Sequence, residues 1–213
     1  MENKLKGFVT HEGESYISFA EITKHAREML KGNWLLSILV TIAYFVILIG
    51  VSVILQKIHI ALGQIGTLII AGPLALGFAV FSLSVSRKNE LEFGQLFAGF
   101  SNFLTAFLAN LLMAIFVILW MLLLIVPGII KGLAYSMTYF ILVDNKDMKA
   151  LEAITKSKEM MQGHKFELFC LQLRFVGWGM LAILTLGIGF LWLFPYMQVS
   201  YAKFYDDLKA TQK

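Results

Sequence analysis

The chain contains uncharged stretches that are too long for a soluble fold of this size. Residues 34–55 form a run of 22 without a formal charge, and residues 93–130 form one of 38. A helix rises about 1.5 Å per residue, so the shorter run spans about 33 Å, enough to cross the hydrocarbon core of a bilayer. Only 15% of the residues are charged, against about 25% in soluble domains. The sequence therefore predicts an all-α, polytopic membrane helix bundle.

Six transmembrane helices follow from these stretches. The run over 93–130 is too long for one crossing, and Pro127-Gly128 is the natural point to divide it. Residues 168–202 hold one charge, on Arg174, and Gly187-Ile188-Gly189 predicts a turn among them. The predicted spans cover residues 34–55, 65–86, 103–126, 128–143, 166–186 and 190–206.

Lysine and arginine are concentrated on one side of this arrangement. Residues 1–33 and 144–165 carry five each, Arg87 and Lys88 lie between the second and third spans, and three follow residue 202. With six spans, these four regions fall on the same side, and they hold 15 of the 18 basic residues. Basic residues mark the cytoplasmic side of a membrane protein, so both termini are predicted to be cytoplasmic.

All three prolines of the chain lie inside the apolar stretches. Pro73, Pro127 and Pro195 each fall in the return leg of a predicted hairpin, where proline removes a backbone donor and breaks or kinks a helix. Their positions predict three hairpin repeats, each with an outward and a return span. The predicted organisation is a polar N-terminal extension (1–17), three repeats (approximately 18–88, 89–145 and 146–206) and a polar C-terminal tail (207–213).

Short amphipathic segments precede the first and fifth spans. Residues 26–33 and 157–164 match position by position in residue character, and apolar residues recur at helical spacing on one face of each segment. Both carry basic residues at the predicted cytoplasmic interface, namely Arg27 and Lys31 in the first and Lys158 in the second. Such helices either bind anionic headgroups or a partner, or pack as a cap across the end of the bundle.

The ends of these amphipathic helices are also marked. Ser18 and Glu21 have the spacing of a capping box, which predicts that the first helix begins there. Gly32 and Gly163 suit the left-handed position that ends a helix, so both amphipathic helices should stop just before the span that follows them.

Two polar residues inside the predicted spans are candidates for a functional role. Arg174 lies about two turns inside the fifth span, where a guanidinium is costly unless it is paired or reaches water. It would either bind an anionic headgroup or substrate, or extend its long side chain to the cytoplasmic surface. Asn110 lies in the third span and can hydrogen-bond to a neighbouring helix.

The sequence contains no catalytic, metal or cofactor motif. The four histidines lack metal-ligand spacing, Cys170 is the only cysteine, and no phosphate-binding glycine loop or nucleophile elbow occurs. We therefore expect neither enzyme activity nor a cofactor. The basic residues cluster at the ends of apolar runs, which favours a role in membrane orientation over nucleic-acid binding.

Several landmarks occur together in the order found in one protein family. They are Leu30 to Trp34, Gly72-Pro73-Leu74, Val126 to Ile130, Met161-Gln162-Gly163 and Phe175 to Trp178. Over roughly residues 18–206, the chain resembles a family of bacterial integral membrane proteins catalogued as domain of unknown function nine-seven-five. The resemblance implies a multi-span protein of the bacterial plasma membrane and supplies no established activity.

These features together favour a membrane protein that is not an enzyme. We expect it to bind membrane lipids, an amphipathic peptide or a partner membrane protein, with a role in envelope integrity or in protection against peptides. A transporter of small solutes or peptides is the alternative, because repeated units with interrupted helices are typical of transporters.

Overall fold

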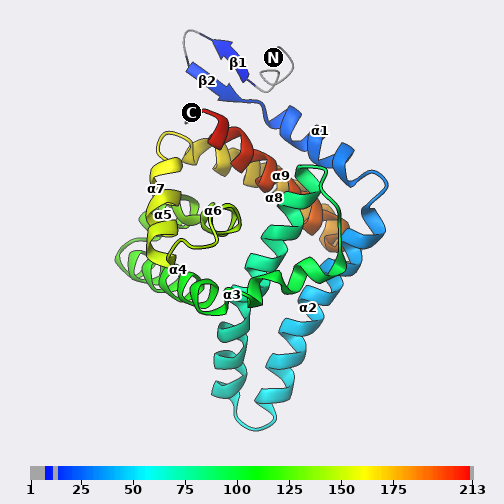
Figure 1. Cartoon of the computed structure of the whole chain (residues 1–213), viewed down its shortest axis with the longest axis vertical. Coiled ribbons are helices and arrows are strands. Elements are labelled where there is room, and N and C mark those ends of the chain that lie inside the picture. Colours follow the sequence, from blue (N-terminus) through cyan, green and yellow to red (C-terminus); the bar gives the residue numbers. More distant parts are fainter. Residues whose placement is uncertain (1–7, 12–13, 212–213) are drawn as a thin grey trace.

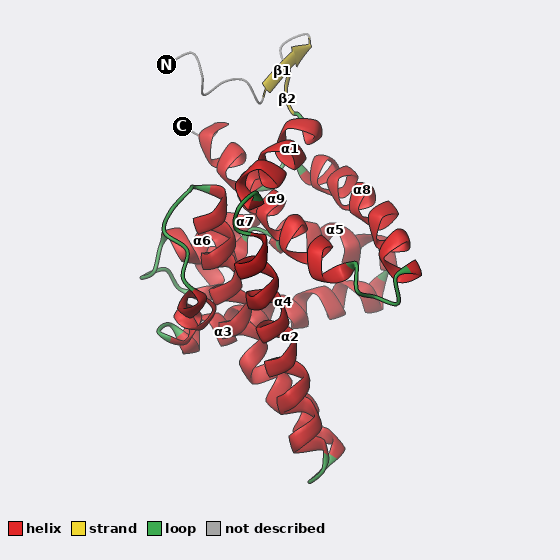
Figure 2. Cartoon of the chain, turned by 90° about the vertical axis from the view of Figure 1, so that its right-hand side faces the viewer, coloured by secondary structure: helices red, strands yellow, loops and turns green. Residues whose placement is uncertain are grey.

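The computed structural model describes residues 8–11 and 14–211, and these form an all-α fold with a small β-hairpin at its N-terminal end (Figures 1 and 2). The hairpin pairs β1 (Phe8–His11) with β2 (Glu14–Ile17) in antiparallel register, within the segment predicted only as a polar extension. The helices that follow are α1 (Phe19–Leu30), α2 (Trp34–Gln56), α3 (Ile60–Ser86), the 3-10 helix η2 (Phe93–Phe100), α4 (Phe103–Leu123), α5 (Ile125–Tyr135), α6 (Thr138–Asp144), α7 (Ala150–Met160), α8 (Lys165–Leu184) and α9 (Phe190–Thr211).

Within the described residues, five helical segments are long and apolar enough to cross a membrane. They are α2, α3, α4, the consecutive helices α5 and α6 taken together, and α8. These segments correspond to the first five predicted spans. The sixth prediction, residues 190–206, is not confirmed in the same way. It lies in α9, a continuous helix of 22 residues whose C-terminal part carries Lys203, Asp206, Asp207 and Lys209.

The fourth span differs from the prediction in two respects. α4 ends at Leu123 and α5 begins at Ile125, so the break comes three residues before Pro127-Gly128. Pro127 is then in the first turn of α5, where the backbone N–H that proline lacks would have had no helical partner. A second interruption at Ser136 and Met137 separates α5 from α6. The predicted single helix is therefore two shorter ones.

The other two prolines lie inside continuous helices. α3 runs through Pro73 and α9 runs through Pro195, so neither residue ends its helix. Around Pro73, α3 packs directly on the backbone of η2. A Cβ added at Gly77 would clash with the carbonyl oxygen of Leu96, and one added at Gly99 would clash with that of Pro73. The close approach of the two backbones therefore requires glycine at both positions.

The first amphipathic helix begins as predicted, and both amphipathic helices end as predicted. The side chain of Ser18 accepts a hydrogen bond from the backbone N–H of Glu21 and caps α1. Gly32 and Gly163 both have positive φ, +92° and +82°, at the turns that follow α1 and α7. α1 buries one face, with Ile22, Ala26 and Leu30 fully enclosed, and packs on α3 and α9. α1 is therefore a cap on the helices around it.

The molecule is elongated by one helical hairpin. The second half of α2 and the first half of α3 project from the remaining helices at the end opposite both described chain ends, in both views (Figures 1 and 2). The outward surfaces of α2, α4 and α8 are apolar, with exposed residues such as Ile54, Leu122 and Met180. Among the described residues, the buried core gathers where α3, α6 and α9 meet.

Candidate functional site

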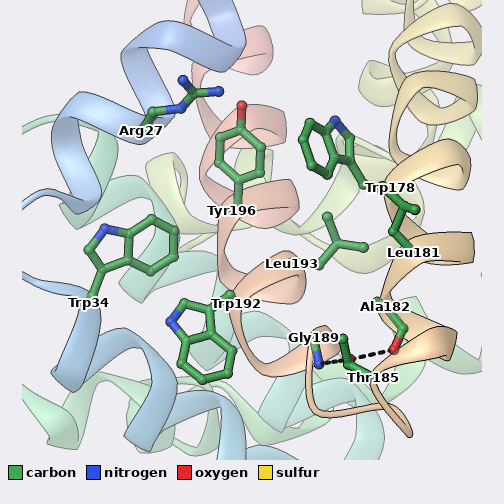
Figure 3. A pocket seen from close by; sticks show the side chains of 10 residues that line it. All are labelled: Arg27, Trp34, Trp178, Leu181, Ala182, Thr185, Gly189, Trp192, Leu193 and Tyr196. Carbon is green, nitrogen blue, oxygen red and sulfur yellow. Dashed lines mark hydrogen bonds between the residues drawn. The ribbon is translucent and has the colours of Figure 1, made fainter.

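A hollow, here called the aromatic groove, lies between α1, α2, α8 and α9 (Figure 3). Its volume is about 540 Å³. The residues that line it are Arg27, Trp34, Trp178, Leu181, Ala182, Thr185, Gly189, Trp192, Leu193 and Tyr196.

Tryptophan dominates the walls of the aromatic groove. Three of the four tryptophans in the chain line it, and Figure 3 shows Trp34 and Trp192 on one side with Trp178 on the other. Trp178 and Trp192 are 52% and 48% exposed, so the groove is open at its side. None of the three indole N–H groups donates a hydrogen bond to the described protein. Indole rings in this arrangement suit a membrane interface, where one end of the ring meets apolar chains and the other a polar donor or acceptor.

Arg27 is the only charged residue among the described ones that line the aromatic groove. It belongs to α1, and Figure 3 places its guanidinium at the end of the groove where the hydroxyl of Tyr196 also lies. The side chain is exposed, and within the described residues it forms no hydrogen bond or ion pair. A guanidinium keeps its charge at any physiological pH and offers five donors. Arg27 is therefore available to an anionic group at the mouth of the groove.

Tyr196 fixes α1 over the aromatic groove. Its hydroxyl donates to the backbone carbonyl of Thr23 in α1 at 3.1 Å, and its ring meets that of Phe175 edge-on at 5.5 Å. His25, on the same helix, contacts the carbonyl oxygen of Ser86 at 3.1 Å through Nε2. Burial lowers the pKa of His25 below its ordinary value, so the docked helix favours the neutral imidazole. These contacts position Arg27.

The turn between α8 and α9 closes the opposite end of the groove. The hydroxyl of Thr185 donates to the carbonyl of Ala182 at 2.7 Å and accepts from the N–H of Gly189 at 2.8 Å, as the dashed lines in Figure 3 show. A Cβ at Gly189 would lie 2.9 Å from Ala182 Cα, so the end of α8 and the beginning of α9 lie close together. Gly187, in the predicted turn, has φ +87°. The predicted turn is confirmed.

Of the residues predicted as sites, only Arg27 lies in the aromatic groove. Lys31 is exposed just after α1, and Lys158 is exposed on α7. Arg174 is exposed on α8, and within the described residues it has no hydrogen-bond or ion-pair partner. Its side chain therefore does not point into the core.

Asn110 lies in the helix packing away from the groove. Its Nδ2 donates to the carbonyl of Leu68 in α3 at 3.4 Å, and its Oδ1 accepts from the hydroxyl of Tyr139 in α6 at 3.0 Å. Asn110 thus joins α3, α4 and α6, which is the interhelical role predicted for it.

Sequence reasoning missed a cluster of charges, here called the ionic cluster. Arg87, just after α3, donates to Asp144 at the end of α6 at 2.7 Å and to Asp206 of α9 at 2.6 Å. Lys209 also pairs with Asp144, and the hydroxyl of Tyr205 donates to Asp144 at 3.0 Å. The hydrogen bonds that Arg87 donates to Asp144 and Asp206 raise the pKa of its guanidinium above the ordinary value.

The ionic cluster joins the ends of the three predicted repeats. Arg87, Asp144 and Asp206 lie at or one residue before positions 88, 145 and 206, where the repeats were predicted to end. The available signal was a charged residue at the same place in each repeat. Sequence separations of 57 and 119 residues hid the pairing.

Comparison with known proteins identifies one family. A family model described as "Protein of unknown function (DUF975)" matches residues 17–131 and 121–212. No curated protein and no solved structure matches the chain.

Proposed function

The chain belongs to the DUF975 family of proteins of unknown function, and from this premise we propose that it is a six-span protein of the bacterial plasma membrane that binds an anionic lipid in the aromatic groove. The observation that carries the proposal is the position of Arg27. It is a lone unpaired cation at the end of a groove whose remaining walls are aromatic and apolar.

The six-span topology is supported by where the helices end. Both described chain ends lie at the same end of the molecule (Figures 1 and 2), as an even number of crossings requires. The ionic cluster brings the C-terminal ends of α3, α6 and α9 together. Three return spans that run in the same direction would end on the same side of the membrane in this way. α9 would be the sixth span. The positive-inside rule then puts the ionic cluster and α1 on the cytoplasmic side.

A lipid chain fits the groove by its shape. From Tyr196 to Gly189 the groove follows about seven residues of α9, or about 10 Å of helix. This length accommodates part of an acyl chain below a headgroup held at Arg27. The open side of the groove, with its half-exposed tryptophans, would face the bilayer and let a chain enter laterally.

The headgroup would determine which lipid binds. An acyl chain gains little by moving from the bilayer into the groove, because lipid tails are as apolar as the side chains they would meet. Arg27 and the free indole N–H groups therefore supply the selectivity. A basic residue at a membrane surface contributes about 1 kcal/mol toward an anionic lipid, or roughly fivefold in affinity. We propose a binding role without catalysis, since the described lining residues include no carboxylate, histidine or cysteine.

Fluorescence of the groove tryptophans tests this proposal. The full chain is reconstituted in nanodiscs that contain phosphatidylglycerol or phosphatidylcholine with brominated acyl chains, which quench nearby indoles. We expect the phosphatidylglycerol to quench at roughly fivefold lower mole fraction. Arg27→Gln should remove this preference, and Arg27→Lys should keep most of it. Lys24→Gln is the matched control, because Lys24 is an exposed cation on α1 that does not line the groove.

Three outcomes would count against the proposal. Equal quenching by brominated phosphatidylglycerol and brominated phosphatidylcholine would exclude selection of an anionic lipid. Equal effects of Arg27→Gln and Lys24→Gln would reduce the result to general surface charge. Displacement of the lipid by an amphipathic peptide, or solute flux into proteoliposomes, would favour the peptide-binding or transport alternatives.

A further inference from the structure

A second hollow, here called the central cavity, lies inside the helix bundle. Its volume is about 230 Å³, room for about seven water molecules at ~30 Å³ each. Residues of α2, α3, α6 and α9 and of the α5–α6 junction line it, but none of the residues of the aromatic groove does. α9 contributes Phe194 and Gln198 to the central cavity and Trp192 and Tyr196 to the groove, so this helix is a wall of both.

Three polar side chains in the central cavity have no protein partner. Tyr44, Gln198 and Tyr201 line it, and among the described residues none of the three forms a side-chain hydrogen bond. Gln198 and Tyr201 are three residues apart on α9, so they occupy one face of that helix. Two other polar residues there are already engaged, because Tyr139 donates to Asn110 and Ser136 to the carbonyl of Leu133. Unpaired polar groups in a bilayer are costly, so the free groups need an occupant that hydrogen-bonds.

The remaining walls of the central cavity are aromatic. Phe78, Phe140 and Phe194 line it beside the tyrosines, and the rings of Phe78 and Phe194 lie 5.2 Å apart, edge to face. Water alone would leave this apolar surface wetted. A small organic molecule would cover it with an apolar body and direct a polar group to Tyr44, Gln198 and Tyr201.

The occupant should carry no charge. Among the residues that the structure describes, no lysine, arginine, histidine, aspartate or glutamate lines the central cavity. Moving an ion from water into such a site without an opposite charge is strongly unfavourable, whereas a neutral amide or hydroxyl needs only its hydrogen bonds to be replaced.

The ionic cluster lies directly behind one wall of the central cavity. Phe140, which lines the cavity, stacks on Tyr205 with ring centroids 5.7 Å apart. The hydroxyl of Tyr205 donates to Asp144 at 3.0 Å, and Asp144 pairs with Arg87. Phe140 and Tyr205 therefore link this wall of the cavity to the ionic cluster at the ends of α3, α6 and α9.

We propose that the central cavity binds one small uncharged molecule with a hydrogen-bonding group on an aromatic or aliphatic body, and that the ionic cluster closes the entrance. This site is independent of the lipid proposed for the aromatic groove, and the two are tested by different probes and variants.

Three ligands of one size distinguish this site from a water-filled hollow. Benzamide, benzoate and benzylammonium share a phenyl ring and differ in charge. Their binding to the full chain in nanodiscs is measured by equilibrium dialysis, with empty nanodiscs subtracted. We expect benzamide to bind at least tenfold more tightly than either ion.

Variants assign the binding to the central cavity. Ala75→Leu adds three carbons to its wall and should weaken benzamide binding at least tenfold, whereas Ala61→Leu, at an exposed site on α3, should leave it unchanged. Tyr201→Phe removes only a hydroxyl and should weaken binding roughly fivefold to tenfold. Arg87→Gln should speed ligand exchange while changing the affinity less than about threefold, as a closed entrance predicts.

Several results would overturn the proposal. Equal binding of all three ligands after the subtraction of empty nanodiscs would reject a site that selects an uncharged molecule. No binding of benzamide above empty nanodiscs would leave water as the only occupant. If Ala75→Leu failed to fold, the conservative Tyr201→Phe would decide, and unchanged affinity in that variant would reject the site. Unchanged exchange in Arg87→Gln would reject the ionic cluster as its closure.

Discussion

The ionic cluster makes a stability prediction that does not depend on any proposed function. The guanidinium of Arg87 donates to both oxygens of Asp144 and both of Asp206, at distances of 2.6–3.2 Å. Within the described residues, Asp206 has no other ion-pair partner, whereas Asp144 keeps Lys209 and Tyr205. Arg87→Gln would therefore leave one carboxylate without an opposite charge and weaken the surroundings of the other.

The burial of the three side chains sets the size of this effect. Exposed ion pairs contribute about 0–1 kcal/mol, and breaking a fully buried pair costs about 3–5 kcal/mol. The side chains of Arg87, Asp144 and Asp206 are 31%, 10% and 25% exposed, between these limits. We expect Arg87→Gln to lower the free energy of unfolding by about 2–3 kcal/mol.

Equilibrium unfolding in mixed micelles, followed by circular dichroism, measures this change. Lys88→Gln is the matched control, since Lys88 is the next residue, is exposed and forms no ion pair among the described residues. A double-mutant cycle of Arg87→Gln with Asp206→Asn should give a coupling of about 1–2 kcal/mol. A loss below about 0.5 kcal/mol, or one equal to that of the control, would refute the reasoning that the cluster holds the three helix ends together.

Three further predictions concern packing, pH and an interhelical hydrogen bond. Gly77→Ala should lower the free energy of unfolding by about 3 kcal/mol, because α3 and η2 would have to separate. Gly132→Ala, with open space around it, should leave that free energy unchanged or raise it by up to about 1 kcal/mol. Thermal unfolding of both variants measures the difference. Burial lowers the pKa of His25 in the folded state, so the unfolded state binds a proton at higher pH than the folded state does. The packing of α1 should therefore loosen as the pH falls through about 6.5. Faster amide exchange in α1 at pH 5.5 than at pH 8, with no such difference in His25→Asn, would confirm this. Asn110→Ala should lower the free energy of unfolding by about 1 kcal/mol, because its hydrogen bond with Tyr139 is lost. An equal loss when Asn110→Ala is made in a Tyr139→Phe background would contradict this.

Local signals predicted helix positions well, and contacts between distant residues poorly. The uncharged run over 34–55 matches α2 to within one residue, because a bilayer requires an uninterrupted apolar stretch of that length. Ser18 and Gly32 marked the ends of α1 because capping depends on a few adjacent residues. The family resemblance is likewise confirmed by the match over residues 17–212.

The parts that were missed depend on tertiary packing. The ionic cluster and the aromatic groove each combine side chains from helices far apart in the chain, which periodicity cannot pair. The split of α5 from α6 was also missed. The structure shows what stabilises it, a hydrogen bond from Ser157 in α7 to the carbonyl of Ala134 and another from the backbone N–H of Met137 to Ser157. Arg27 was singled out from sequence, but only as one of several interfacial cations.

The polarity of α9 has a consequence for how such a chain reaches its final topology. Every helix that α9 contacts extensively, namely α1, α2, α3 and α8, precedes it in the sequence. A segment with this many polar side chains would not partition from the insertion machinery into lipid by its own hydrophobicity. On a six-span topology, α9 would therefore insert by packing against the preceding helices after they have folded. Biogenesis and tertiary assembly would then be one process, and damage to α3, which α9 contacts, would appear as a misplaced C-terminus.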